Sequence, residues 1–272
     1  VTGVQTCALP ISQSPSAAPY PFPLGVASGY PRPDGMVLWT RLVGDEVKAA
    51  PVPVRWELAR DEAFRDVAAA GVVEASPDWA HAVHVEPRGL AADQWYWYRF
   101  HALGATSRAG RTRTAPTADA MPARLRFAFA SCQQYEQGWF TAHRHIAADQ
   151  PDLVAFLGDY IYESSWGTDH VRKHPSRGQP YSLAEYRDRY ALYKSDPDLQ
   201  ASHAACPWIV TWDDHEVVND YAAGQGWGGS RLEWPFLERR SAAYRAFYEH
   251  QPLPSSMRPA GGEMRIYTTL DW

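Results

Sequence analysis

The pattern of hydrophobic and polar positions along the chain changes once, between residues 117 and 122. Before that point, short segments alternate apolar with polar residues, and turns containing Gly or Pro separate them. A period of two is typical of half-buried β-strands, and several such strands in a short stretch favour an antiparallel β-sandwich. The predicted strands are residues 36–42, 52–59, 82–86 and 94–101.

From residue 122 onwards, continuous apolar runs alternate with segments of helical periodicity. This alternation indicates an α/β fold, and a helical crossover between two apolar runs indicates adjacent parallel strands. The predicted strands are residues 125–130, 153–157 and 208–212, and the predicted helices are residues 138–149, 183–193 and 234–250. Residues 264–272 read as a further strand that the end of the sequence interrupts, so we expect a truncated chain.

The change of pattern defines the predicted domains. Residues 22–117 form a β-sandwich domain and residues 122–272 an α/β domain, with a linker at residues 109–116. We exclude residues 1–21 from the fold. The first part of this segment, VTGVQTCALPIS, reads as a translated sequencing adapter and not as a signal peptide, and a Pro-, Ser- and Ala-rich linker follows it.

Composition removes several classes of function. The chain has a net charge of −5 and no block of Lys and Arg, which argues against binding to nucleic acid or to an anionic membrane. No apolar run approaches the roughly 20 residues that cross a bilayer. The motifs of serine hydrolases, nucleoside triphosphatases and dinucleotide-binding enzymes are absent from the sequence. Cys132 and Cys206 should lie near opposite edges of the sheet, which leaves Cys132 free to bind a metal.

Polar residues with metal-binding side chains follow each of the three apolar runs. Cys132 follows the first run, Asp159 and Tyr162 follow the second, and the sequence Asp213-Asp214-His215-Glu216 follows the third. Parallel sheets bind ligands outside the carboxyl ends of their strands. We therefore expect these side chains to meet at one edge of the sheet, where their composition is that of a metal site.

Asp159 is the strongest candidate ligand, because Gly158 before it gives the backbone freedom to project a carboxylate that can bridge two cations. Its alternative interpretation is a helix N-cap. Tyr162, three residues later, is either a core residue or a phenolate ligand for a strongly polarising ion such as Fe³⁺. Cys132 is either a small buried apolar residue or a thiolate, and a thiolate beside a phenolate favours iron.

The run after the third strand places consecutive charges at the end of a buried segment, which is costly unless they are paired or bind a metal. We expect Asp214 to bind a second cation, and His215 to hydrogen-bond a substrate oxygen or protonate the leaving group. Asn219 either completes the metal shell or caps the start of a helix. The alternative for the whole run is a solvated loop.

The polar stretch at residues 163–180 is too long for a simple connection and is a candidate substrate-facing loop. Its residues His170, Arg172 and His174 either steer an anionic substrate or are solvated. His143 and His145 should point to different faces of one helix, so they cannot chelate a metal together.

Three blocks of the second domain, FASCQQYEQGWFTAHRHIA, LGDYIYE and VTWDDHEVVNDYA, resemble the core blocks of the PhoD-like alkaline phosphatases, within the calcineurin-like and purple acid phosphatase group. The segment FPLGVASGYPRPDGMVLWTRL resembles the N-terminal domain of that family, and residues 90–100 resemble part of a fibronectin type III domain. The resemblance implies a fibronectin- or immunoglobulin-like sandwich followed by an αββα metallophosphatase sandwich. It also implies a periplasmic or extracellular enzyme that hydrolyses phosphate monoesters and diesters.

The same resemblance implies a particular metal site. Cys132, Asp159 and Tyr162 would surround Fe³⁺, and Asp159 would also touch a neighbouring Ca²⁺. Asp214 and His215 match a motif of metallophosphoesterases in which Asn precedes the His, and Asn219 is a calcium-side candidate. We expect further ligands beyond Trp272.

The resulting hypothesis is in-line attack on phosphorus by a metal-activated hydroxide, with small phosphate esters as substrates. Two alternatives stay open: another dinuclear pair such as Zn²⁺ or Mn²⁺, and a phosphate-ester-binding protein whose metallophosphatase domain is degenerate.

Overall fold

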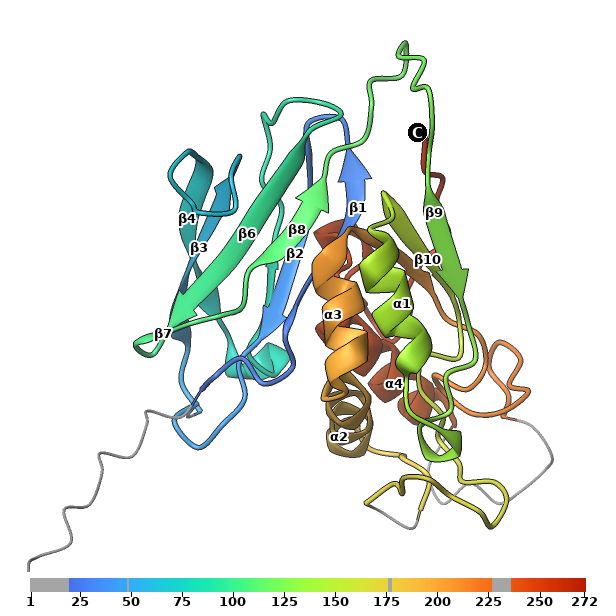
Figure 1. The fold of residues 1–272 in the computed structure, drawn as a ribbon. Helices are drawn as coiled ribbons and strands as arrows, with labels where there is room; N and C mark the ends of the chain where they lie inside the picture. The colour runs from blue at the N-terminus through green and yellow to red at the C-terminus, as the bar shows by residue number, and fades with distance from the viewer. Residues whose placement is uncertain (1–19, 48, 176–177, 227–235) are drawn as a thin grey trace, which may run out of the picture.

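The computed structural model describes residues 20–47, 49–175, 178–226 and 236–272, so the predicted adapter and most of the linker lie outside the described residues. Its strands form two sheets, of six and five strands (Figure 1). In spatial order, the first sheet contains β5 (Ala82–Val85), β2 (Gly35–Arg41), β1 (Val26–Arg32), β11 (Trp208–Thr211), β10 (Leu153–Leu157) and β9 (Phe127–Ala130). The second contains β4 (Val67–Ala75), β3 (Val52–Ala59), β6 (Trp95–Ala102) and β7 (Ala105–Thr106), with β8 (Gly110–Arg113) also paired to β6.

The predicted parallel arrangement in the second half of the chain is confirmed. Strand β10 pairs in parallel with β9, with Val154 opposite Ala128, and in parallel with β11, with Val154 opposite Trp208. Helix α1 (Thr141–Asp149) makes the crossover between β9 and β10. The carboxyl ends of three neighbouring strands therefore lie at one edge of the sheet.

Strands of both halves of the chain share the six-stranded sheet. Strand β1 pairs antiparallel with β2, and it also pairs in parallel with β11 at Gly29 and Trp208. A Cβ atom at Gly29 would lie 2.6 Å from the carbonyl oxygens of Trp208 and Pro252, so only glycine allows this close approach. The sequence pattern does not predict this continuity.

The first half also has a core between the two sheets. Val26 and Leu38 of the six-stranded sheet pack in one buried cluster with Val54, Tyr98 and Phe100 of the five-stranded sheet. These side chains occupy alternate positions of their strands, as the period-two pattern predicts. Strands β2, β3, β5 and β6 match the four predicted segments to within a residue or so at each end.

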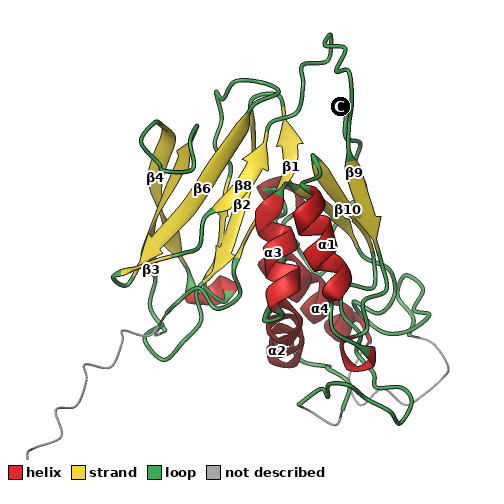
Figure 2. Cartoon of the chain, viewed as in Figure 1, coloured by secondary structure: helices red, strands yellow, loops and turns green. Residues whose placement is uncertain are grey.

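The helices lie beside the six-stranded sheet, away from β3 and β4 (Figure 2). Among the described residues they are α1, α2 (Leu183–Lys194), α3 (Pro197–Ala205) and α4 (Phe236–His250), with short 3₁₀ turns at Pro77–Trp79, Tyr135–Gln137 and Ser255–Met257. Helix α2 begins at a capping box, in which Ser182 and Glu185 satisfy each other's backbone N–H groups. Its residues Tyr186, Tyr190 and Tyr193 are buried at helical spacing. The start of the predicted third helix, residues 234–235, lies outside the described residues.

One expectation for the second half is wrong. Residues 264–272 form no strand, because no neighbouring strand pairs with their backbone. One face of β9 and β10 is open, with Phe127 and Phe129 being 56% and 69% exposed. The described core packs only on the opposite face, which carries Val154 and Phe156.

Among the described residues, no helix has the length and apolar character needed to cross a membrane.

Candidate metal centre

The centre begins where β9 and β10 end. Beyond these strands the pairing continues, as the N–H groups of Cys132 and Gln133 donate to the carbonyl oxygens of Gly158 and Asp159, both at 3.2 Å. Cys132 and Asp159 both have left-handed backbone conformations, with φ of 59° and 57°. Such strain in residues other than glycine gathers at functional sites, where the surrounding structure holds it in place.

Gly158 allows the loops after β10 and β11 to touch. Its φ is +103°, and a Cβ atom at this position would lie 2.6 Å from the Cβ and the backbone nitrogen of Asp213. Any side chain would push the two loops apart. The glycine is therefore required by both its conformation and its contact with the neighbouring loop.

Asp159 forms hydrogen bonds with two other candidate ligands, Cys132 and Tyr162. Its Oδ2 accepts hydrogen bonds from Cys132 Sγ at 3.3 Å and from the Tyr162 hydroxyl at 2.9 Å. Its other oxygen, Oδ1, is buried and has no hydrogen-bond partner. Burial and the nearby Asp159 carboxylate raise the pKa of Tyr162, so a phenolate at this position requires a cation. An unpartnered buried carboxylate oxygen beside a thiol and a phenol fits a metal ion.

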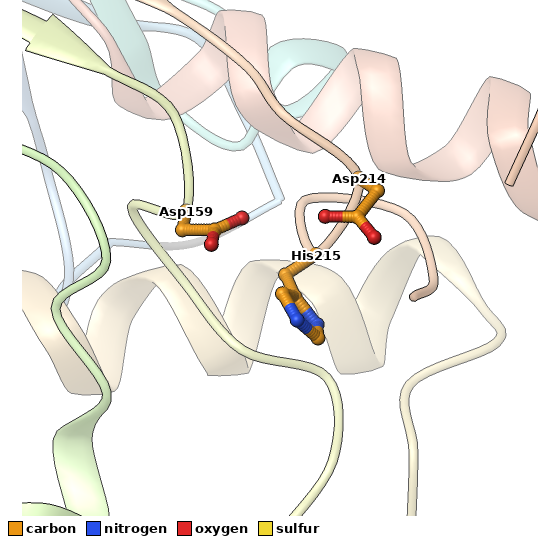
Figure 3. Close-up of side chains that lie close together, drawn as sticks. All are labelled: Asp159, Asp214 and His215. Carbon is orange, nitrogen blue, oxygen red and sulfur yellow. The ribbon is translucent and has the colours of Figure 1, made fainter. Parts of the chain in front are cut away.

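Asp214 and His215 join this group from the loop after β11. Asp159, Asp214 and His215 each place one potential ligand atom within 4.8 Å of the others (Figure 3). The carboxylates of Asp159 and Asp214 point toward one another beside the His215 ring. Asp214 also accepts a hydrogen bond from the backbone N–H of Asp220. The strand ends thus bring together the five candidates Cys132, Asp159, Tyr162, Asp214 and His215.

Two alternatives from the sequence do not match this geometry. No helix follows Asp159, so it is not an N-cap, and residues 214–220 form turns, so Asn219 caps no helix. The side-chain amide of Asn219 donates to Asp220 at 2.9 Å, and its backbone N–H donates to Glu163 at 3.1 Å.

Cys132 is exposed and Cys206 is buried, and both are free, as predicted.

Glu163 orients His215, a role that the sequence pattern does not reveal. This carboxylate is buried, and its Oε2 lies 2.7 Å from His215 Nδ1. Burial opposes protonation of His215, but the hydrogen bond and the charge of Glu163 outweigh it, so the pKa of His215 is raised. Because Glu163 holds Nδ1, Nε2 is the ring nitrogen available to a ligand.

Glu216 holds together the loops that follow β10 and β11. It is buried, and its Oε2 accepts from the N–H groups of Asp159 at 3.2 Å and Asp213 at 2.9 Å, while Oε1 accepts from Tyr160 N at 2.5 Å. Burial raises the pKa of Glu216 to about 8, although the backbone donors favour its ionised form. The sequence places Glu216 beside the candidate ligands but assigns it no role.

The long loop at residues 163–175 is anchored by two of the residues proposed to steer substrate. Arg172 is buried and donates to Asp196 and to the carbonyl oxygen of Gly138, both at 2.7 Å. His174 is also buried: its Nε2 lies 3.2 Å from the Tyr193 hydroxyl oxygen, and its backbone N–H donates to Glu136 at 2.9 Å. The steering role is therefore wrong for Arg172 and His174, because their side chains are occupied inside the protein.

The fold and the site define an α/β protein with a carboxylate-rich centre at the carboxyl edge of its parallel strands. Residues 127–272 match the sequence model of the PhoD-like phosphatases, and residues 6–116 match that of the N-terminal domain of PhoD-like phosphatases. The chain is also 47% identical over 270 residues to alkaline phosphatase D of Bacillus subtilis (strain 168), an alignment that covers 96% of this chain and 46% of the relative.

A solved structure described as the structure of PhoD has the same fold. It matches with a TM-score of 0.89 and 47% identity, over 94% of this chain and 50% of that one. The chain belongs to the PhoD-like phosphatase family. It spans about half the length of the relatives that it matches.

Proposed function

We propose that this chain carries the metal-binding part of an alkaline phosphatase that hydrolyses phosphate monoesters and diesters outside the cytoplasm. The observation that carries the proposal is the buried, unpartnered Oδ1 of Asp159, which lies in a group with Asp214 and His215. The relative that is 47% identical is an alkaline phosphatase by name.

Cys132, Asp159 and Tyr162 would hold Fe³⁺, because a thiolate and a phenolate suit a transition metal. Asp159, Asp214 and Asn219 offer oxygen atoms, the ligands that suit Ca²⁺. When bound, the two ions would activate the attacking water and neutralise charge on the phosphoryl oxygens.

The protein's own groups would position the ester and handle the proton. His215 Nε2 would hydrogen-bond the ester oxygen and give it a proton as the leaving group departs. The buried Glu163 carboxylate at Nδ1 supports this role, because it orients the ring and favours its protonated form. Glu216 would keep Asp159 at a constant distance from the loop that carries Asp214.

The test compares metal content and hydrolysis in matched variants. Asp159→Asn should lower bound iron and calcium, measured by elemental analysis, and reduce hydrolysis of nitrophenyl phosphate and bis-nitrophenyl phosphate about 100-fold or more. Asp119→Asn, at an exposed position outside the centre, is the control. Unchanged metal content and turnover in Asp159→Asn would refute the assignment, and zinc or manganese in the wild type would replace the proposed ion pair.

We also propose that the open face of β9 and β10 packs against a second sheet, as an αββα architecture requires. The exposed Phe127, Phe129 and Leu157 support this arrangement, because parallel sheets are covered on both faces. Phe129→Ser should reduce binding of a hydrophobic dye to this chain without lowering its melting temperature. Equal dye binding in both forms would argue against an open apolar face.

A further inference from the structure

Trp166 lies beside the proposed proton donor. Its ring centroid is 5.4 Å from that of His215 and 5.0 Å from that of Tyr162, which it meets edge to face. Tyr162 and His215 are themselves in contact, with centroids 4.3 Å apart. The three rings form one aromatic wall at the metal centre, defined here as Tyr162, His215 and Trp166.

Trp166 differs from the other two members because it keeps a large part of its surface free. Trp166 is 42% exposed, whereas Tyr162 and His215 are buried. An exposed indole beside a group that should contact substrate offers an aromatic face to a ligand. The sequence places Trp166 in the candidate substrate-facing loop but assigns it no function.

The loop holds Trp166 in position despite this exposure. The indole Nε1 donates to Ser164 Oγ at 2.9 Å, and His170 Nε2 lies 2.7 Å from the carbonyl oxygen of Trp166. Further along, the buried Arg172 and His174 fix the loop to the protein interior. A ligand that stacks on Trp166 would therefore meet a surface that is largely formed in advance, which reduces the entropy lost on binding.

We propose that Trp166 determines specificity by contacting the leaving group, and that it favours esters whose leaving group has an aromatic ring directly on the ester oxygen. This inference rests on the proposed function. An ester oxygen that accepts from His215 Nε2 would carry its substituent next to that imidazole. Aromatic centroids interact at 4.5–7 Å, and the Trp166 centroid lies 5.4 Å from that of the imidazole. A ring attached to the ester oxygen would therefore have an aromatic partner beside it, whereas a short alkyl group has no π-face to offer.

The test measures kcat/KM for phenyl phosphate and for ethyl phosphate in the metal-loaded protein. Trp166→Ala should lower the value for phenyl phosphate about three- to tenfold and change that for ethyl phosphate less than about twofold. Trp166→Phe should restore most of the loss, because it keeps an aromatic face. Trp139→Ala is the matched control, since Trp139 is 62% exposed and its ring centroid lies 4.7 Å from the Arg172 guanidinium carbon.

A parallel measurement with phenylphosphonate and methylphosphonate, by titration calorimetry, does not depend on turnover. The wild type should bind the phenyl compound more tightly, and Trp166→Ala should remove most of that difference. If Trp166→Ala lowers kcat/KM equally for phenyl phosphate and ethyl phosphate, Trp166 supports the His215 ring and does not select the leaving group. If kcat/KM falls for neither ester, the proposal is also overturned. If the wild type neither hydrolyses the esters nor binds the phosphonates, the proposed function itself fails. Binding without turnover leaves the phosphonate comparison to decide the role of Trp166.

Discussion

The buried Lys194 at the end of α2 gives a prediction about stability that needs no bound metal. Its ammonium group lies 3.5 Å from His203 Nε2 and 4.3 Å from the centroid of the Trp39 ring, and the residue is 1% exposed. No salt bridge joins Lys194 to a carboxylate within the part of the chain that the structure describes. A desolvated cation–π contact contributes about 2 kcal/mol, whereas taking an unpaired ammonium out of water costs several kcal/mol.

Desolvation therefore prevails, and burial lowers the pKa of Lys194 well below its ordinary value. The unfolded chain binds a proton at this position that the folded protein does not bind, in the pH range between the lowered pKa and about 10.4. Stability should rise with pH through that range, because the unfolded state holds more protons there. A single group of this kind contributes a slope of about 1.4 kcal/mol per pH unit.

Lys194→Met keeps most of the side-chain volume and removes the proton. The variant should be more stable than the wild type at neutral pH, and its free energy of unfolding should rise less steeply with pH. Urea unfolding followed by Trp fluorescence at several pH values between about 7 and 9 measures both quantities. Lys173→Met, at an exposed position, is the control. Equal slopes in the Lys194→Met variant and the wild type would show that Lys194 stays charged in the folded protein and would refute the reasoning.

Two further predictions concern the candidate metal centre. Gly158→Ala should destabilise the chain by more than about 2 kcal/mol and lower its metal content, because a left-handed backbone and a 2.6 Å contact with Asp213 exclude a side chain. Gly138→Ala, where a Cβ would meet nothing within 4 Å, is the control in thermal unfolding, and equal melting temperatures would contradict the argument. Glu163→Gln keeps the shape of the side chain but loses its charge, so hydrolysis should fall about 10–100-fold. NMR titration should show a lower pKa for His215 in that variant, and an unchanged pKa would remove Glu163 from its positioning role.

The sequence alone determined the elements that build the centre. The apolar runs around β9, β10 and β11 and the crossover helix α1 follow from local periodicity, and each run ends in polar residues. Since parallel strands align their carboxyl ends, the approach of Asp159 to Asp214 followed from strand order alone. These features are predictable because each depends on residues that are close in the sequence or on a general rule of sheet geometry.

The tertiary structure decided the features that depend on partners far apart in the sequence. Glu163 and Glu216 became buried supports because of the groups that face them, and no local pattern separates them from surface carboxylates. The pairing of β1 with β11 likewise depends on the contact of Gly29 with Trp208. The role proposed for Trp166 follows only from its position beside His215. Hydrophobic periodicity predicts which side of a helix or strand is buried. It does not identify the residues that this side contacts, because those contacts form only in the folded chain.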